Sequence, residues 1–279
     1  MKKRRLILIF SIMMLLVMIF LLPSPLFRLK EVRVSFFDPN YKEVSLSSNS
    51  VFTSTKNVEA IIDKGEFDFG ELIFFSPKDK YAKRLENSFP YLKVLSIVSL
   101  FPNKLRLNLQ ERQEMAYMSC EGGYIILDRE FKILRYSTSC PSDRLFIQFY
   151  SENGSEVSFF DFFEISHQAF CEGQFLSENN FVFTGILNIF NVIESVGDNF
   201  SNFILKLAIT KDDSNLTTLS IFSTSPYGVT LKVEDLLNDF DYKLTKLLSA
   251  LNTLYFKENV KTTHGTLKIN TAKNVSWQE

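Results

Sequence analysis

The chain has 279 residues, and its 31 basic and 32 acidic side chains leave a formal net charge of −1. This balance excludes the overall electrostatic attraction expected of a nucleic-acid-binding protein, so any recognition must be local. Aromatic residues make up 14% of the chain and only 10 residues are glycine, which favours packed strands and helices over disorder. Outside one apolar N-terminal stretch about 250 residues remain, enough for two modest domains or one large domain.

Residues 6–22 form that stretch, LILIFSIMMLLVMIFLL, with Ser11 as its one polar residue. A helix of this length covers about 25 Å and is at the short end of a membrane span. Pro23 and Pro25 would end it where a span should emerge. A cleaved signal peptide is the alternative, but the bulky residues that follow do not suit cleavage.

Four adjacent basic residues precede the apolar stretch and resist translocation. The sequence therefore predicts a cytoplasmic tail at residues 1–5, a transmembrane helix at residues 6–22, and nearly all of the mass on the far side of the membrane.

Hydrophobic periodicity after the predicted span changes from strand to helix and back. Asn57 is a candidate N-cap for the first helix. Because such elements bury their apolar faces together, two helices should pack on one face of a three-stranded sheet. The expected elements are, in order, a strand at 29–37, helices at 58–65 and 77–89, and a hairpin of strands at 93–100 and 104–111.

Short apolar runs with turn residues between them follow from residue 113, which predicts an antiparallel meander. Residues 140 to 180 give no clear pattern. The expected elements are strands at 115–119, 124–128 and 131–137, a helix at 181–196, strands at 203–210, 217–223 and 228–234, and a long helix at 233–255. A terminal hairpin, 259–263 with 266–270, should then end the ordered chain, with its last strand at a sheet edge.

Catalytic and metal-binding patterns are missing from the sequence. The chain has two histidines, His167 and His264, and no HExxH, GxSxG or phosphate-loop pattern. We therefore expect no enzyme activity, no cofactor and no metal. The three cysteines, Cys120, Cys140 and Cys171, are too few for a disulfide framework, although one pair could form outside the cytoplasm.

The segment NSFPYLKVLSIVSLFPNKLRLNLQERQEMAYM resembles the end of a POTRA domain in the FtsQ/DivIB family of bacterial division proteins, with Pro102, Asn103, Glu111 and Arg112 as matching positions. The strand and long helix in YGVTLKVEDLLNDFDYKLTKLLSALNTL are similar to that family's C-terminal region. Departures are the missing glycine after the first POTRA strand and the long loop from Asp38 to Thr55.

This resemblance implies an α+β fold: a POTRA domain (β-α-α-β-β) at residues 28–112, an antiparallel β domain with a long C-terminal helix at residues 113–270, and a tail at residues 271–279. It implies a non-catalytic scaffold of the inner membrane that positions division proteins at the septum. A POTRA-type envelope chaperone or protein-export component is the alternative function.

In the family the partners are the coiled-coil proteins FtsB and FtsL, which the resemblance places at the terminal strand. An extended partner segment would pair with the exposed backbone of an edge strand. Leu267 and Ile269 would either read the partner or pack inward, since one face of a strand must be buried. The predicted partner-binding residues are Thr266, Leu267, Lys268, Ile269 and Asn270.

Overall fold

The protein is described by a computed structural model that divides into two compact units, residues 1–112 (unit 1) and residues 113–279 (unit 2). The division falls at the predicted domain boundary. The structure describes residues 25–44, 55–141, 144–164, 171–176, 204–211, 216–223, 229–236, 238–257 and 265–278. The predicted span at 6–22, the predicted helix at 181–196 and both histidines lie outside these residues. Over the described ranges, every helix is too short or too polar to cross a membrane.

Unit 1 has the predicted order of strand, helix, helix, strand and strand, with one short strand added in the segment expected to be a loop. Its elements are η1 (Pro25–Phe27), β1 (Glu31–Phe37), β2 (Glu43–Val44), α2 (Thr55–Gly65), η2 (Ile73–Phe75), α3 (Lys78–Ser88), β3 (Leu92–Leu100) and β4 (Lys104–Glu111). The sheet order is β2-β1-β4-β3, with β1 parallel and β3 antiparallel to β4. Helix α2 begins at Thr55, so Asn57 lies inside it, and the predicted cap is wrong.

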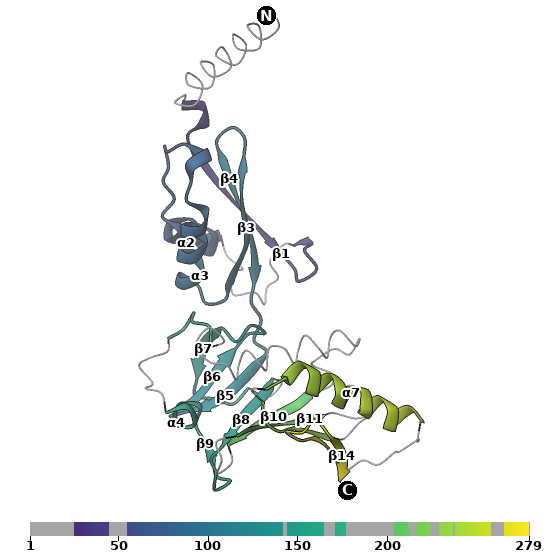
Figure 1. Cartoon of the computed structure of the whole chain (residues 1–279). Helices are drawn as coiled ribbons and strands as arrows, with labels where there is room; N and C mark the ends of the chain where they lie inside the picture. The colour runs from purple at the N-terminus through teal and green to yellow at the C-terminus, as the bar shows by residue number, and fades with distance from the viewer. Residues whose placement is uncertain are drawn as a thin grey trace, which may run out of the picture. The chain divides into compact units, whose positions relative to one another are not determined.

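The alternating pattern of β4 builds the core of unit 1. Leu105, Leu107 and Leu109 are fully buried, while the residues between them are half-buried on the other face. Both helices lie on the same side of the sheet (Figure 1), and they bring Ile61, Tyr81 and Leu85 into the same hydrophobic cluster as these leucines. The period of two in the sequence therefore fixes which face of β4 the helices cover.

Unit 2 is one mixed sheet with the order β14-β13-β12-β11-β10-β8-β5-β6-β7, and β9 pairs with β8. Its elements are β5 (Ala116–Cys120), β6 (Gly123–Leu127), β7 (Ile133–Ser137), β8 (Leu145–Tyr150), β9 (Glu156–Val157), α4 (Phe159–Phe163), β10 (Ile204–Lys211), β11 (Thr217–Ser223), β12 (Thr230–Val233), α7 (Phe240–Lys257), β13 (Thr266–Ile269) and β14 (Val275–Gln278). The meander β5-β6-β7 is antiparallel as predicted.

The expectation of a wholly antiparallel domain is wrong. Strand β8 is parallel to both β5 and β10, and β13 is parallel to β12. Periodicity gives each strand its buried face but not its neighbour, so the parallel pairs had no local signal. Strand β8 and helix α4 also lie between residues 140 and 180, where no clear pattern predicts an element.

The long C-terminal helix covers one face of β12, β13 and β14 (Figure 1). It buries Leu244, Leu247 and Leu248 in the same cluster as Leu267 and Ile269. Helix α7 starts at Phe240 rather than at the predicted Val233. Asp235 and Asp239, which both precede the helix, have φ of 53° and 50°. This left-handed conformation cannot be part of a right-handed helix.

The prediction that Thr266–Asn270 forms the last strand, at the sheet edge, is wrong. Strand β13 lies between β12 on one side and β14 on the other, so its backbone is paired on both sides. Residues 271–279, predicted as a tail, contain the turn and strand β14. The four-residue run VSWQ is too short to show a period of two, so the sequence pattern does not predict this strand.

Replacing Leu107 with alanine should destabilise unit 1 by about 2–5 kcal/mol, because the side chain is fully buried between sheet and helices. Native-state hydrogen exchange of the full chain would measure the loss in β1, β3 and β4. Val98→Ala is the matched control, since Val98 is 41% exposed in the same sheet. Equal losses of protection in both variants would contradict the assigned core.

Candidate functional site

The candidate site is the outer edge of β14, which follows β13 through a tight turn. The Lys273 N–H donates to the Asn270 carbonyl at 2.9 Å, and the Asn270 N–H donates to the Asn274 carbonyl at 3.1 Å. Lys273 has φ of 63°, as required at the last position of a three-residue hairpin loop. The Asn274 N–H donates to the Asn270 side-chain oxygen at 2.9 Å, so that Asn270 fixes the turn from both its backbone and its side chain.

The hairpin determines which backbone groups of β14 face outward. In an antiparallel ladder, hydrogen-bonded and non-hydrogen-bonded pairs alternate. Since Asn270 and Asn274 form a bonded pair, the backbones of Ser276 and Gln278 point toward β13, and those of Val275 and Trp277 point away from it. Within the described part of the chain, no strand pairs with this outer side. Such an edge is a template for another strand.

Trp277 holds β14 against the body of unit 2. Its side chain and that of Val275 pack on the hydrophobic core from the face that α7 covers. The indole ring lies against Gly265, where an added Cβ would be 2.1 Å from Cζ2 of Trp277. Only glycine permits this approach. On the opposite face Ser276 and Gln278 are exposed.

Asp239, just before α7, and Tyr242 and Lys246 in its first turns clasp the hairpin turn. The Lys273 ammonium lies 2.5 Å from the Asp239 carboxylate, and Lys246 Nζ donates to the Lys273 carbonyl at 2.7 Å. Both ammonium groups lie near the Tyr242 ring, at 5.4 Å for Lys273 and 5.8 Å for Lys246. Lys273 lowers the pKa of Asp239, and Asp239 raises the pKa of Lys273. Because these groups are exposed, the clasp orders the turn more than it stabilises the fold.

The five residues predicted to bind a partner lie just inside the edge. Leu267 and Ile269 are 2% and 0% exposed and belong to the core. Both side chains therefore pack inward. Lys268 pairs with Glu234 at 2.5 Å on the other face, Thr266 pairs with Gln278, and Asn270 forms the turn. Whether any of the five contacts a partner stays a prediction.

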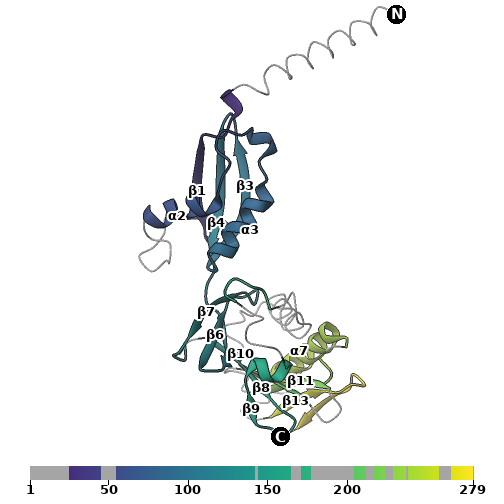
Figure 2. The ribbon, with the colours of Figure 1, turned by 90° about the vertical axis from the view of Figure 1, so that its left-hand side faces the viewer.

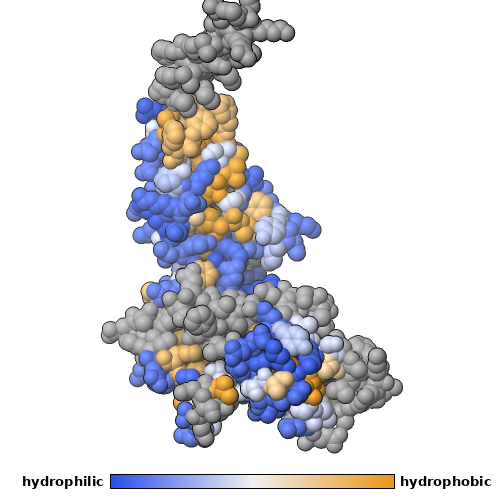
Figure 3. Space-filling view, viewed as in Figure 1, coloured by the Kyte–Doolittle hydropathy of each residue, from blue (hydrophilic) through white to orange (hydrophobic). Residues whose placement is uncertain are grey.

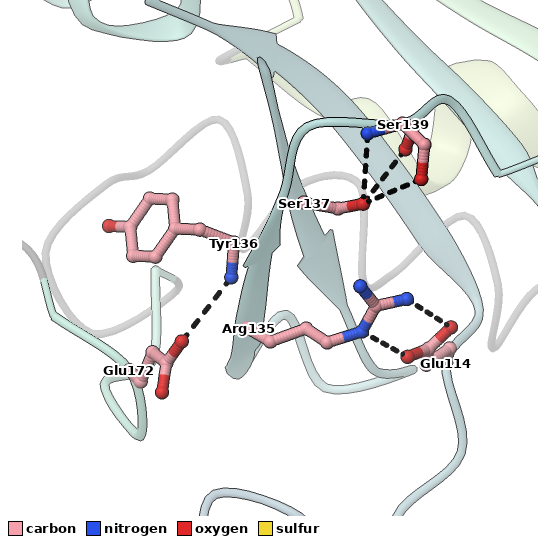
Figure 4. A network of polar contacts seen from close by, with 6 residues as sticks. All are labelled: Glu114, Arg135, Tyr136, Ser137, Ser139 and Glu172. Carbon is pink, nitrogen blue, oxygen red and sulfur yellow. Dashed lines mark hydrogen bonds and ion pairs between the residues drawn. The ribbon is translucent and has the colours of Figure 1, made fainter. Parts of the chain in front are cut away.

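The opposite end of the sheet, at β7, is occupied by the segment 171–176. Ile133 exchanges backbone hydrogen bonds with it: its N–H donates to Gln174 and its carbonyl accepts from Gly173, both at 2.8 Å. Figure 4 shows Glu172 of the same segment, which accepts from the Tyr136 N–H at 3.3 Å. The figure also shows Arg135 on β7 bound to Glu114 at 2.7 Å. The two ends of the sheet therefore differ in how much backbone they leave open.

The four positions that resemble the family motif do not form one site. Pro102 and Asn103 lie in the turn between β3 and β4, and Glu111 and Arg112 lie at the other end of β4. Arg112 is 7% exposed, and its Nε donates to the Leu92 carbonyl at 3.3 Å. Arg112 thus closes the end of unit 1, which is a structural role.

Among the described residues, no group of three or more His, Cys, Asp or Glu side chains could hold a metal ion. Cys120, Cys140 and Cys171 are free thiols, so the optional disulfide is not formed in this structure. Burial raises the pKa of the Cys120 thiol, which disfavours its reactive thiolate at neutral pH.

No protein-family model and no curated protein sequence matches the chain. Among solved structures, the chain is similar to the major extracytoplasmic domain of the trans isomer of the bacterial cell division protein DivIB from Geobacillus stearothermophilus, at 12% identity. The similarity covers 54% of this chain and 98% of that one, with a TM-score of 0.24. At this TM-score it establishes neither the fold nor the function of the chain.

Replacing Gly265 with alanine should displace the Trp277 ring and loosen β14, because the new methyl group would overlap the indole. Trp277 is the chain's one tryptophan, so a red shift of its emission reports the change directly. In the Trp277→Phe background the overlapping atoms are absent, and Gly265→Ala should then cost less protection in hydrogen exchange of β13 and β14. Equal costs in both backgrounds would contradict the contact.

Acidification should release the turn from α7. The lowered pKa of Asp239 means that its contribution is present above the unfolded-state pKa and is lost as pH falls through the folded-state value. The raised pKa of Lys273 means that its contribution is lost only as pH rises through that value. Across the neutral range both are present. Trp277 emission should therefore change at acid pH, and Asp239→Asn should abolish the change; a change that survives in this variant has another origin.

Proposed function

We propose that this chain is a membrane-anchored, non-catalytic scaffold of bacterial cell division, which binds partner proteins by strand addition at β14. The observation that carries the proposal is the outer edge of β14, whose described neighbours leave the outward N–H and C=O groups of Val275 and Trp277 open. The resemblance of residues 87–118 and of the C-terminal strand and helix to the FtsQ/DivIB family supports the division role.

The size of this edge limits what the backbone alone contributes. Val275 and Trp277 offer two donors and two acceptors, and each net hydrogen bond is worth about 1 kcal/mol, for a total of about 4 kcal/mol. With no cost of association this would correspond to a dissociation constant of about 1 mM, and the translational and rotational freedom lost on binding makes the backbone contribution weaker still. Side chains must therefore supply the rest of a useful affinity. Tyr242, a large side chain of α7 that is 54% exposed beside the clasped turn, is a candidate for this role.

The proposed partners are FtsB-like and FtsL-like coiled-coil proteins of the same membrane, and other septal wall-synthesis proteins are further candidates. Residues 6–22 would hold the chain in the inner membrane with residues 1–5 inside and both units outside the cytoplasm. Strand addition suits this arrangement, because an extended segment beyond a coiled coil can pair with an edge without refolding the scaffold.

Because β14 and not β13 is the edge strand, the sharpest test changes a residue of β14. Val275→Pro should lower binding to FtsB-like and FtsL-like proteins co-expressed with the full chain, because proline removes an outward donor and leaves the ladder to β13 intact. Val275→Ala loses the same side chain but keeps the N–H, and should bind much more strongly than the proline variant. Trp277 emission checks that β14 remains docked. Equal binding by the two variants would count against strand addition at this edge.

Localisation separates the division role from the alternative of an envelope chaperone or export component. A fluorescent fusion of the full chain should gather at midcell, and its depletion should produce filamentous cells. An even distribution around the envelope, with normal septa after depletion, would favour the export role.

A further inference from the structure

One end of unit 1 exposes an unusual amount of apolar surface. Four side chains there are 51–72% exposed, and we call them the apolar tip: Leu26, Phe74, Phe75 and Phe101. They come from η1, η2 and the turn between β3 and β4. Figure 3 shows an apolar area over this end of unit 1. Contiguous exposed apolar surface of this kind marks a place where a protein meets a partner or a membrane.

Backbone contacts bring the three segments of the tip together. The Leu29 N–H donates to Glu71 at 2.8 Å, which places η1 beside the start of η2, and the Lys30 N–H donates to Asn103 at 2.9 Å, which places it beside the β3–β4 turn. Phe27 lies beneath them, with its ring centroid 5.6 Å from that of Phe74 and 5.2 Å from that of Phe101. The tip is therefore one surface built on an aromatic support, as Figure 2 shows for the strand ends and η1.

Charged groups around the tip favour an anionic surface. Arg28 and Lys30 are exposed, and Arg28 Nη1 donates to the Gly70 carbonyl at 3.1 Å. Glu31, the carboxylate that follows Lys30 in the chain, is engaged by Lys104 and by Arg33, which lower its pKa. Glu71 is the other exposed carboxylate close by. Cations thus outnumber unpaired acids around the phenylalanines, a combination typical of segments that lie in the lipid headgroup layer.

The chain itself limits how far the tip can be from a bilayer. If residues 6–22 span the membrane, the four residues from 23 to 26 reach at most about 14 Å. The headgroup layer is roughly 5–8 Å thick on each side. Leu26 must therefore lie at or just above the lipid surface, and the three phenylalanines share its end of unit 1.

We infer that the apolar tip is a lipid-contacting surface, which inserts its phenylalanines shallowly into the extracytoplasmic leaflet while Arg28 and Lys30 meet lipid phosphates. This inference rests on the anchor in the proposed function. Insertion would give unit 1 a second attachment besides the span and so hold its sheet in a defined orientation to the membrane. The partner is a phospholipid bilayer rather than a second protein.

The test places a fluorescent reporter at the tip of the full chain reconstituted in nanodiscs of phosphatidylcholine and phosphatidylglycerol with brominated acyl chains. In the Trp277→Phe background, Phe101→Trp and Phe75→Trp introduce a single tryptophan at the tip. Tyr41→Trp is the matched control, because Tyr41 is 75% exposed in the same unit, in the turn that follows β1. Seven residues of β1 separate the two ends by about 23 Å.

Bromolipids should remove most of the emission of a tryptophan at position 101 or 75 and leave that at position 41 unchanged. Equal emission at the three positions, in chains that stay with the nanodiscs, would overturn the inference and leave the anchor standing. Chains that elute apart from the nanodiscs would overturn the anchor, and the inference with it. Self-association of chains with an unquenched tip would assign the surface to a second copy and would also overturn it.

Discussion

The constraint behind both units is that every backbone N–H and C=O group in a sheet needs a partner, which is another part of the chain or, at an exposed edge, water. The sheet of unit 1 ends in the short strand β2 at one edge and in β3 at the other. Unit 2 meets this constraint at β7 through the segment 171–176. At β14 the described residues leave it unmet. The function proposed for the chain depends on this difference between two ends of one sheet.

Packing explains why β14 is a stable edge strand although it is short. Four residues provide little ladder, but Trp277 fills the space that Gly265 leaves, and Val275 joins the same core. The turn is held by Asn270 and by the clasp from α7. The edge is therefore built before any partner arrives, so that binding need not include the entropic cost of ordering it.

Sequence patterns predicted local structure better than they predicted neighbours. The three leucines of β4 and the hairpin around Pro102 follow from alternation and turn residues, and the structure places them as expected. The predicted start of α7 is too early because Leu236 has helical spacing. Leu236 is buried, but it lies in the connection between β12 and α7, which contains two left-handed residues. The parallel pairs of β8 depend on residues distant in sequence. The predicted edge strand, β13, is one strand away from the true edge, β14, since VSWQ is too short to show a period of two.

The parallel pairing of β1 with β4 has a mechanical consequence. Seven residue pairs, from Glu31 with Lys104 to Phe37 with Gln110, join the strand by which the chain enters unit 1 to the strand by which it leaves. Tension applied through the two ends of the unit would pull these strands along their length in opposite directions, so all rungs of the ladder bear load together rather than opening one after another. Unit 1 would therefore transmit force between its two ends through the hydrogen bonds between β1 and β4, which are loaded in shear.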